Sequence, residues 1–152
     1  MSTTVRWFLR SAVAWLVLGM GLGIWMGAAP ERIVELRPAH LHAVLPGFVL
    51  MMIFGVAYHI LPRFSGRPVP WARGPSVHLA LANVGLLVTV PGFLLRVRFP
   101  EAGRILVPLG GSVMLLGACF FVHTVWSLTE RPKWNPRAPG ATSAWTSIPT
   151  RP

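Results

Sequence analysis

Charged residues are scarce in this chain of 152 residues: only 12% are charged, whereas 53% are hydrophobic. Soluble domains use about 25% charged residues, and a soluble fold of this length could not hide so much apolar surface. Acidic side chains are rarest, four against fourteen basic ones, which gives a formal net charge of +10. The basic residues are spread over connections and the C-terminal end instead of forming a stripe or cluster. No nucleic-acid partner is therefore expected.

Cysteine occurs once, at Cys119, so neither a disulfide framework nor a cysteine-based zinc site can form within one chain. An internal repeat is also missing, because the two halves of the chain each contain two apolar segments whose motifs do not match. Many transporters are built from repeats with broken helices. A transporter or channel is therefore a weaker interpretation of this sequence.

Four segments lack charge over about 20 residues, the length that a helix needs to cross a bilayer. They predict an all-α integral membrane protein, a four-helix transmembrane bundle within residues 1–131, with spans at about 8–29, 39–62, 76–96 and 105–128. The Pro-rich residues 132–152 are expected to form a flexible cytoplasmic tail. Glycine-rich helix faces favour close helix contacts, so we expect a homo-oligomer in the lipid bilayer.

The distribution of basic residues predicts the orientation. Alternate connections place nine Arg and Lys on one side and five on the other, which by the positive-inside rule makes both termini cytoplasmic in the cell (inner) membrane. The nine are Arg6, Arg10, Arg63, Arg67, Arg73, Arg131, Lys133, Arg137 and Arg151, and the five are Arg32, Arg37, Arg96, Arg98 and Arg104. A cleaved signal peptide ending near Ala29 is the alternative, but its apolar run is long for one.

Histidines are the informative residues, because ionisable side chains are costly within a bilayer and are candidates for function there. His40 and His42 open the second span and are expected near the outer side of the membrane. Near the inner side are His59, His78 and His123. At a rise of about 1.5 Å per residue, His40 and His59 lie roughly 28 Å apart. The two groups of histidines therefore cannot share a ligand.

The outer pair suggests a haem site. His40 and His42 are two positions apart, about 200° around a helix, so only one can face the bundle interior unless the helix begins after them. Neutral imidazole is the usual axial ligand of haem iron in a helical bundle, and haem propionates need cationic partners. Arg37 precedes His40 by three residues, at the depth where such a partner is needed.

The inner histidines leave two interpretations open. A histidine at the end of a span is often interfacial, with its ring in the apolar layer and its nitrogens in water. If His59, His78 and His123 converge instead, they would hold a second haem or a metal ion and give an electron path across the membrane. The methionines are expected to fill packing gaps, although Met26 lies at the level of His40.

The second apolar segment resembles the second transmembrane helix of subunit I in heme-copper oxidases, most closely the cbb-type cytochrome oxidases and the related nitric oxide reductases. The matching residues are Leu36-Arg37-Pro38-Ala39-His40, Gly47, Phe54-Gly55, Tyr58 and Leu61-Pro62-Arg63. The resemblance implies that His40 is the axial ligand of a low-spin haem b near the outer face, with Arg37 as the preceding basic residue. Tyr58-His59 stands where that family has an aromatic pair. Tyr58 matches the pair and His59 departs from it.

The resemblance is confined to this segment. The family's subunit I has about a dozen spans, and its other haem and metal histidines lie on helices for which this chain has no counterpart. Reduction of oxygen or nitric oxide by this chain alone is therefore not expected. The chain resembles small four-span proteins that look like a truncated subunit I.

Two functions are considered. The first is a membrane haem b protein that transfers electrons or senses a diatomic gas, the sixth iron ligand being His42 or His40 of a second chain, Met26, or none. The alternative is a noncatalytic accessory or assembly subunit of a terminal oxidase or nitric oxide reductase. In that role His40 and His42 would handle copper, which imidazole suits.

Overall fold

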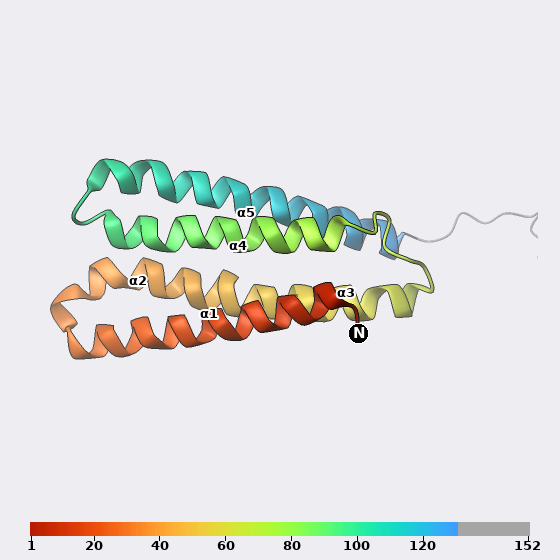
Figure 1. Cartoon of the computed structure of the whole chain (residues 1–152), viewed down its shortest axis with the longest axis horizontal. Helices are drawn as coiled ribbons and strands as arrows, with labels where there is room; N and C mark the ends of the chain where they lie inside the picture. The colour runs from red at the N-terminus through yellow and green to blue at the C-terminus, as the bar shows by residue number, and fades with distance from the viewer. Residues whose placement is uncertain (131–152) are drawn as a thin grey trace, which may run out of the picture.

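The computed structural model describes residues 1–130, which are helical apart from short connections (Figure 1). The predicted tail at 132–152 lies outside the described residues. The elements in chain order are α1 (Thr3–Ala28), the 3₁₀ turn η1 (Pro30–Arg32), α2 (Ile33–His42), the π-helix η2 (Ala43–Leu50), α3 (Met51–Ser65), α4 (Gly74–Leu95) and α5 (Pro100–Thr129). Elements η1 to α3 follow one another without a break as one long helical segment.

Within residues 1–130 four helical segments are long and apolar enough to cross a membrane, which confirms the predicted all-α class and agrees with four spans. The second runs over Pro30–Ser65 and the fourth over Pro100–Thr129, with 36 and 30 residues. At about 1.5 Å per residue the second is roughly 54 Å long, well beyond the roughly 30 Å of hydrocarbon. Both helical segments begin at a proline that precedes the apolar run, because proline is favoured at the first helical position. The polar residues that follow the proline do not end the helix.

The helices lie side by side as two pairs, α1 beside the Pro30–Ser65 segment and α4 beside α5 (Figure 1). Glycines bring each pair together. In the first pair, the ring of Trp15 covers Gly47, and a Cβ on Gly47 would lie 2.8 Å from that side chain. In the second pair, Gly85 and Gly110 bring the two backbones together, since a Cβ on Gly110 would lie 2.6 Å from the carbonyl oxygen of Gly85. Small residues at helix interfaces allow this approach.

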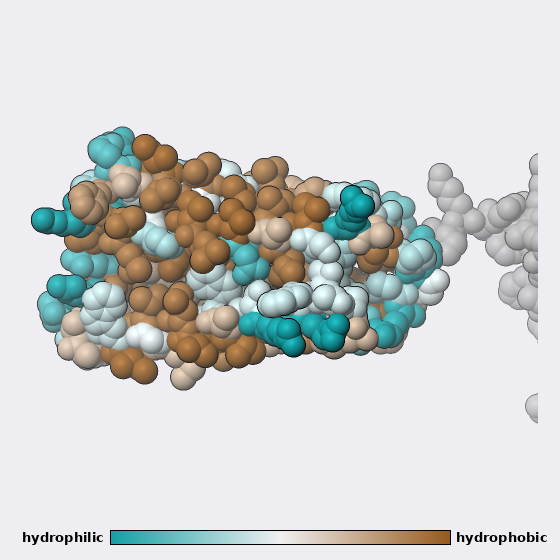
Figure 2. Space-filling view, in the orientation of Figure 1, coloured by the Kyte–Doolittle hydropathy of each residue, from teal (hydrophilic) through white to brown (hydrophobic). Residues whose placement is uncertain are grey.

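Large apolar side chains cover the middle of the outer surface, as Figure 2 shows on one face. Ile24, Leu115 and Trp126 are 72%, 65% and 68% exposed. Hydrophilic residues gather toward the two ends of the molecule (Figure 2). An apolar band between polar ends is the pattern that a bilayer stabilises and that water does not.

The two ends of the bundle differ in acidic residues. One end has five arginines and one glutamate: Arg6, Arg10, Arg63, Arg67, Arg73 and Glu130. The other has five arginines and three glutamates: Arg32, Arg37, Arg96, Arg98, Arg104, Glu31, Glu35 and Glu101. The other basic residues counted for the cytoplasmic side lie outside the described residues. Membrane orientation therefore stays a prediction.

Proline accounts for the wide helical turns that follow His42. Pro46 has no N–H group, so it cannot donate to the carbonyl four residues earlier, that of His42. The chain passes this point as the π-helix η2. Such turns are frequent at functional sites. Here the π-helix separates the His40 region from the aromatic residues of α3.

Candidate functional site

His40 lies on α2 with its ring against α1. Its Nδ1 is 2.8 Å from the carbonyl oxygen of Gly19, and its Cε1 would lie 3.2 Å from a Cβ on Gly23. The two glycines thus leave room for the imidazole. A carbonyl oxygen only accepts hydrogen bonds, so Nδ1 is the donor, and in the neutral imidazole Nε2 then keeps its lone pair. His40 is half-buried and is preceded by seven residues of α2. It therefore lies within the helix and does not open it.

His42 faces a different helix. Its Nδ1 lies 2.9 Å from the carbonyl oxygen of Pro38, and its ring centroid is 4.7 Å from that of Phe93 on α4. His42 is also half-buried. The expectation that only one of the two histidines faces the bundle interior does not hold, because α2 contacts α1 on one side and α4 on another. Their rings therefore do not form a ligand pair for one ion.

Arg37 and Met26 both lie near this region. Arg37 is exposed one turn before His40, and its guanidinium makes no hydrogen bond or ion pair within residues 1–130. Met26 follows Gly23 by three residues on α1 and is half-buried against the hydrophobic core. It therefore lies on the same side of α1 as the glycine that His40 touches.

The inner histidines do not come together. His59 is bound by Arg63, whose Nη1 lies 2.8 Å from the imidazole Nδ1, and His123 is exposed on α5. His78 alone of the three is buried, at 1% exposure. Within residues 1–130 no three His, Cys, Asp or Glu side chains are grouped closely enough to hold a metal ion. The three inner imidazoles therefore do not share one metal ion.

His78 is instead enclosed by aromatic rings, an arrangement that sequence reasoning missed. The hydroxyl of Tyr58 lies 3.1 Å from Nδ1 of His78. The ring centroids of Phe8, Phe54 and Phe121 lie 5.4, 4.5 and 6.0 Å from the centroid of the imidazole. Phe54 and Tyr58 are four residues apart and so share one helix face, which was the available signal. Tyr58 thus pairs with His78 of α4 and not with its chain neighbour His59.

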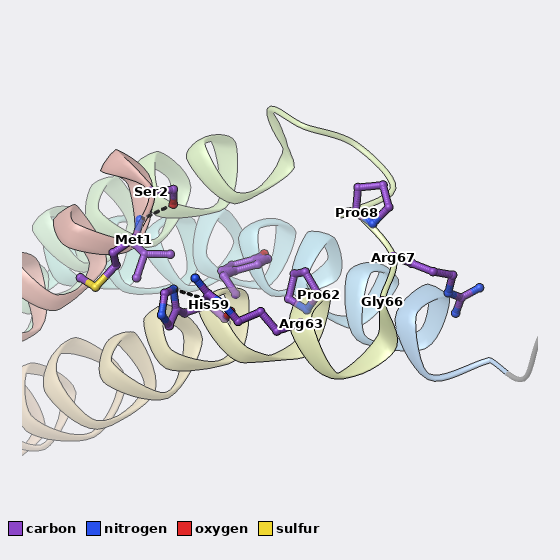
Figure 3. A pocket seen from close by; sticks show the side chains of 10 residues that line it. Met1, Ser2, His59, Pro62, Arg63, Gly66, Arg67 and Pro68 are labelled. Carbon is purple, nitrogen blue, oxygen red and sulfur yellow. Dashed lines mark hydrogen bonds between the residues drawn. The ribbon is translucent and has the colours of Figure 1, made fainter.

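Two hollows adjoin this aromatic cluster. The first is a cavity of about 240 Å³ between η2, α3, α4 and α5, lined by Pro46, Leu50, Phe54, His78, Ala82, Leu86, Gly111, Met114, Leu115 and Ala118. The second is a polar pocket of about 540 Å³ at one end of the bundle, seen in Figure 3, lined by Met1, Ser2, Val5, Tyr58, His59, Pro62, Arg63, Gly66, Arg67 and Pro68. Tyr58 lines the polar pocket and bonds to His78, so it connects the two hollows.

A family model matches residues 5–130, which include the four apolar helices except for the first two residues of α1, and every histidine of the chain. The chain belongs to the family described as a domain of unknown function, DUF8744. No curated protein and no solved structure matches it.

Each of the five imidazoles of this DUF8744 chain has a ring nitrogen that makes no hydrogen bond within residues 1–130. In His40, His42 and His78 the Nδ1 atom is hydrogen bonded, and Nε2 makes no hydrogen bond within residues 1–130. Among those residues only the hydroxyl of Thr89 is fully buried without a partner, so none of the three Nε2 atoms is sealed off. Neutral imidazole with a free Nε2 can bind a metal or accept a hydrogen bond.

Proposed function

We propose that this chain is a multi-pass membrane protein that binds haem b through Nε2 of His40 and has a redox or gas-linked role in the respiratory membrane. The observation that carries the proposal is the bond from Nδ1 of His40 to the carbonyl of Gly19. Metal-ligating histidines almost always donate their second ring N–H to such an acceptor, which fixes the tautomer and the ring orientation. The resemblance of the surrounding segment to an oxidase haem helix adds to it.

The surroundings of His40 suit a haem placed between chains. Neighbouring residues of α2 and η2 present apolar side chains outward: Val34, Leu41 and Leu45 are 85%, 39% and 52% exposed. A macrocycle held there would be covered on one side by this chain and on the other by a second copy, whose His40 would supply the sixth ligand in a symmetric dimer. The guanidinium of Arg37, which has no partner within residues 1–130, would bind a propionate, since guanidinium and carboxylate form strong hydrogen bonds.

The residues of this chain would hold and orient the group. The haem, when bound, would supply one-electron or gas-binding chemistry at its iron. Gly19 would fix the tautomer of His40, the close contact at Gly23 would fix the ring's position, and α1 would shield it from water. Both termini are proposed to be cytoplasmic, which places His40 toward the outer face.

The alternative is a noncatalytic accessory or assembly subunit of a terminal oxidase or nitric oxide reductase, with or without copper. A copper site of both outer histidines within one chain finds less support, because the ring of His40 touches α1 and that of His42 lies against Phe93 of α4. The geometry around His40 therefore supports haem binding. If the protein binds no haem, the accessory role is the better account.

The test is the reduced-minus-oxidised visible spectrum of protein purified from cells with ample haem. We expect b-type bands in the parent and their loss in His40→Ala. His123→Ala is the matched control, because His123 is exposed on α5 and its variant is expected to keep the bands. Carbon monoxide then separates an electron carrier, whose spectrum would not change, from a gas binder. A parent without haem would overturn the proposal.

A further inference from the structure

We propose that the cavity beside His78 binds the ring of a membrane-soluble quinone, with Nε2 of His78 as the hydrogen-bond partner of a ring oxygen. This inference goes beyond the haem proposal and does not rest on it. The residues that line this cavity include neither His40 nor its neighbours on α2.

The size and lining of the cavity select the class of ligand. Its volume is about 240 Å³ and His78 is the one polar residue in its lining. Pockets for drug-sized ligands have about 300–1,000 Å³. The cavity therefore suits a single substituted ring and is too small for a haem. Leu50, Gly111 and Leu115 in the lining are exposed on the outer surface, so a ligand dissolved in the bilayer could enter between the helices.

The hydrogen-bonding capacity of His78 matches a quinone in both of its redox forms. When the hydroxyl of Tyr58 donates to Nδ1, Nε2 carries the proton and can donate to a ring carbonyl. When Nδ1 donates to the tyrosine oxygen instead, Nε2 can accept from a ring hydroxyl. A tyrosine hydroxyl allows either arrangement because it is both a donor and an acceptor. The 3.1 Å contact between the two side chains supports this exchange.

The aromatic cluster holds the imidazole in place for a ligand. Rings of Phe8, Phe54 and Phe121 pack around it, and Phe54 also lines the cavity and offers a ring for aromatic contact. Preorganised polar groups in an otherwise apolar site provide orientation and specificity. A lipid acyl chain would leave Nε2 without a partner, at a cost in free energy that a ring oxygen would avoid.

The experiment measures binding of ubiquinone-1 to purified full-length protein in detergent by isothermal titration calorimetry. The main variant is Gly111→Leu. A Cβ at Gly111 meets nothing within 4 Å, so the added side chain should occupy the cavity without displacing the backbone. Gly21→Leu is the matched control, an exposed helical glycine with equally open surroundings that lies outside the cavity. His78→Phe removes the polar partner.

We expect saturable binding by the parent and by Gly21→Leu, and at least tenfold weaker binding by Gly111→Leu and by His78→Phe. In parent protein labelled with ¹⁵N-histidine, the Nε2 signal of His78 should shift when the quinone is added. No binding by the parent, or equal binding by Gly111→Leu, would overturn the proposal. Loss in Gly111→Leu with unchanged binding by His78→Phe, and no shift of the Nε2 signal, would make the cavity an acyl-chain site and would also overturn it.

Discussion

The imidazole Nδ1 of His40 lies 2.8 Å from the carbonyl oxygen of Gly19, across the interface between α2 and α1. This contact depends on the absence of a side chain at Gly19 and at Gly23 of α1. A Cβ on Gly19 would lie 3.5 Å from the Cβ of Ala43 and closer still to the side chain of Val44, and a Cβ on Gly23 would press on the ring of His40. Gly19 and Gly23 therefore determine the position of the His40 imidazole, the proposed haem ligand.

Gly23→Leu is expected to lower haem occupancy to the level of His40→Ala, because the new side chain would displace the imidazole from α1. Gly27→Leu is the control on the same helix, since a Cβ at Gly27 meets nothing within 4 Å. Haem content per protein is measured by the pyridine haemochrome assay. Equal haem content in the two leucine variants would show that the ring position set by α1 does not matter.

Gly110 and Gly111 are adjacent on α5 and should respond in opposite ways to alanine. A methyl group at Gly110 meets the side chain of Thr89 and the carbonyl of Gly85, whereas one at Gly111 meets nothing within 4 Å. Overpacking typically costs about 1–3 kcal/mol, so Gly110→Ala should destabilise the protein by that amount. Gly111→Ala should instead stabilise it by up to about 1 kcal/mol through helix propensity.

Unfolding of these two alanine variants in mixed micelles provides the free energies. Changes of stability in the same direction and by the same amount in both variants would contradict the close α4–α5 contact at Gly110.

Asn83 connects α4 to α1. Its Oδ1 accepts a hydrogen bond from Trp15 Nε1 at 3.1 Å, and its Nδ2 lies 3.3 Å from the hydroxyl of Ser11. Interhelical hydrogen bonds of this kind are worth about 0.6 kcal/mol on average and up to about 1.7 in membranes. A double-mutant cycle of Trp15→Phe and Asn83→Leu should give a coupling energy in that range. If the effects of the two substitutions are strictly additive, the hydrogen bond contributes nothing to stability.

The fold class could be predicted because it depends on the length and apolarity of segments, which are properties of the sequence alone. Helix ends were less predictable. The second helix starts at Pro30 and not near Ala39, because Glu31, Arg32 and Glu35 end an apolar run without ending a helix. The apolar pattern therefore predicts His40 at the opening of a helix, whereas seven residues of α2 precede it.

The candidate site could be predicted only in part. His40 could be selected from its cost in a bilayer and from the resemblance to an oxidase helix, but its bond to Gly19 depends on packing between helices. The aromatic enclosure of His78 unites residues of α1, α3, α4 and α5, which periodicity within any one helix cannot show. The sequence likewise predicts how far along its span each inner histidine lies, but not the direction of its side chain, which depends on how the helices pack.

Membrane orientation can be tested with single cysteines in a Cys119→Ser background. Arg73→Cys and Arg98→Cys are matched changes of exposed arginines in connections at opposite ends of the bundle. If both termini are cytoplasmic, an impermeant maleimide should label Arg98→Cys in spheroplasts and should label Arg73→Cys only after the membrane is disrupted. The reverse pattern would place His40 toward the cytoplasm.

The central claim, that Nε2 of His40 binds haem iron, is tested most directly by chemical rescue of His40→Gly. This variant removes the imidazole and leaves a space beside Gly19 and Gly23, and the reduced-minus-oxidised spectrum is recorded with haem supplied, before and after adding imidazole. The account predicts that the b-type bands are absent without imidazole and return with it, because free imidazole can occupy the vacated position as ligand. Bands of full intensity in His40→Gly without imidazole would contradict the claim.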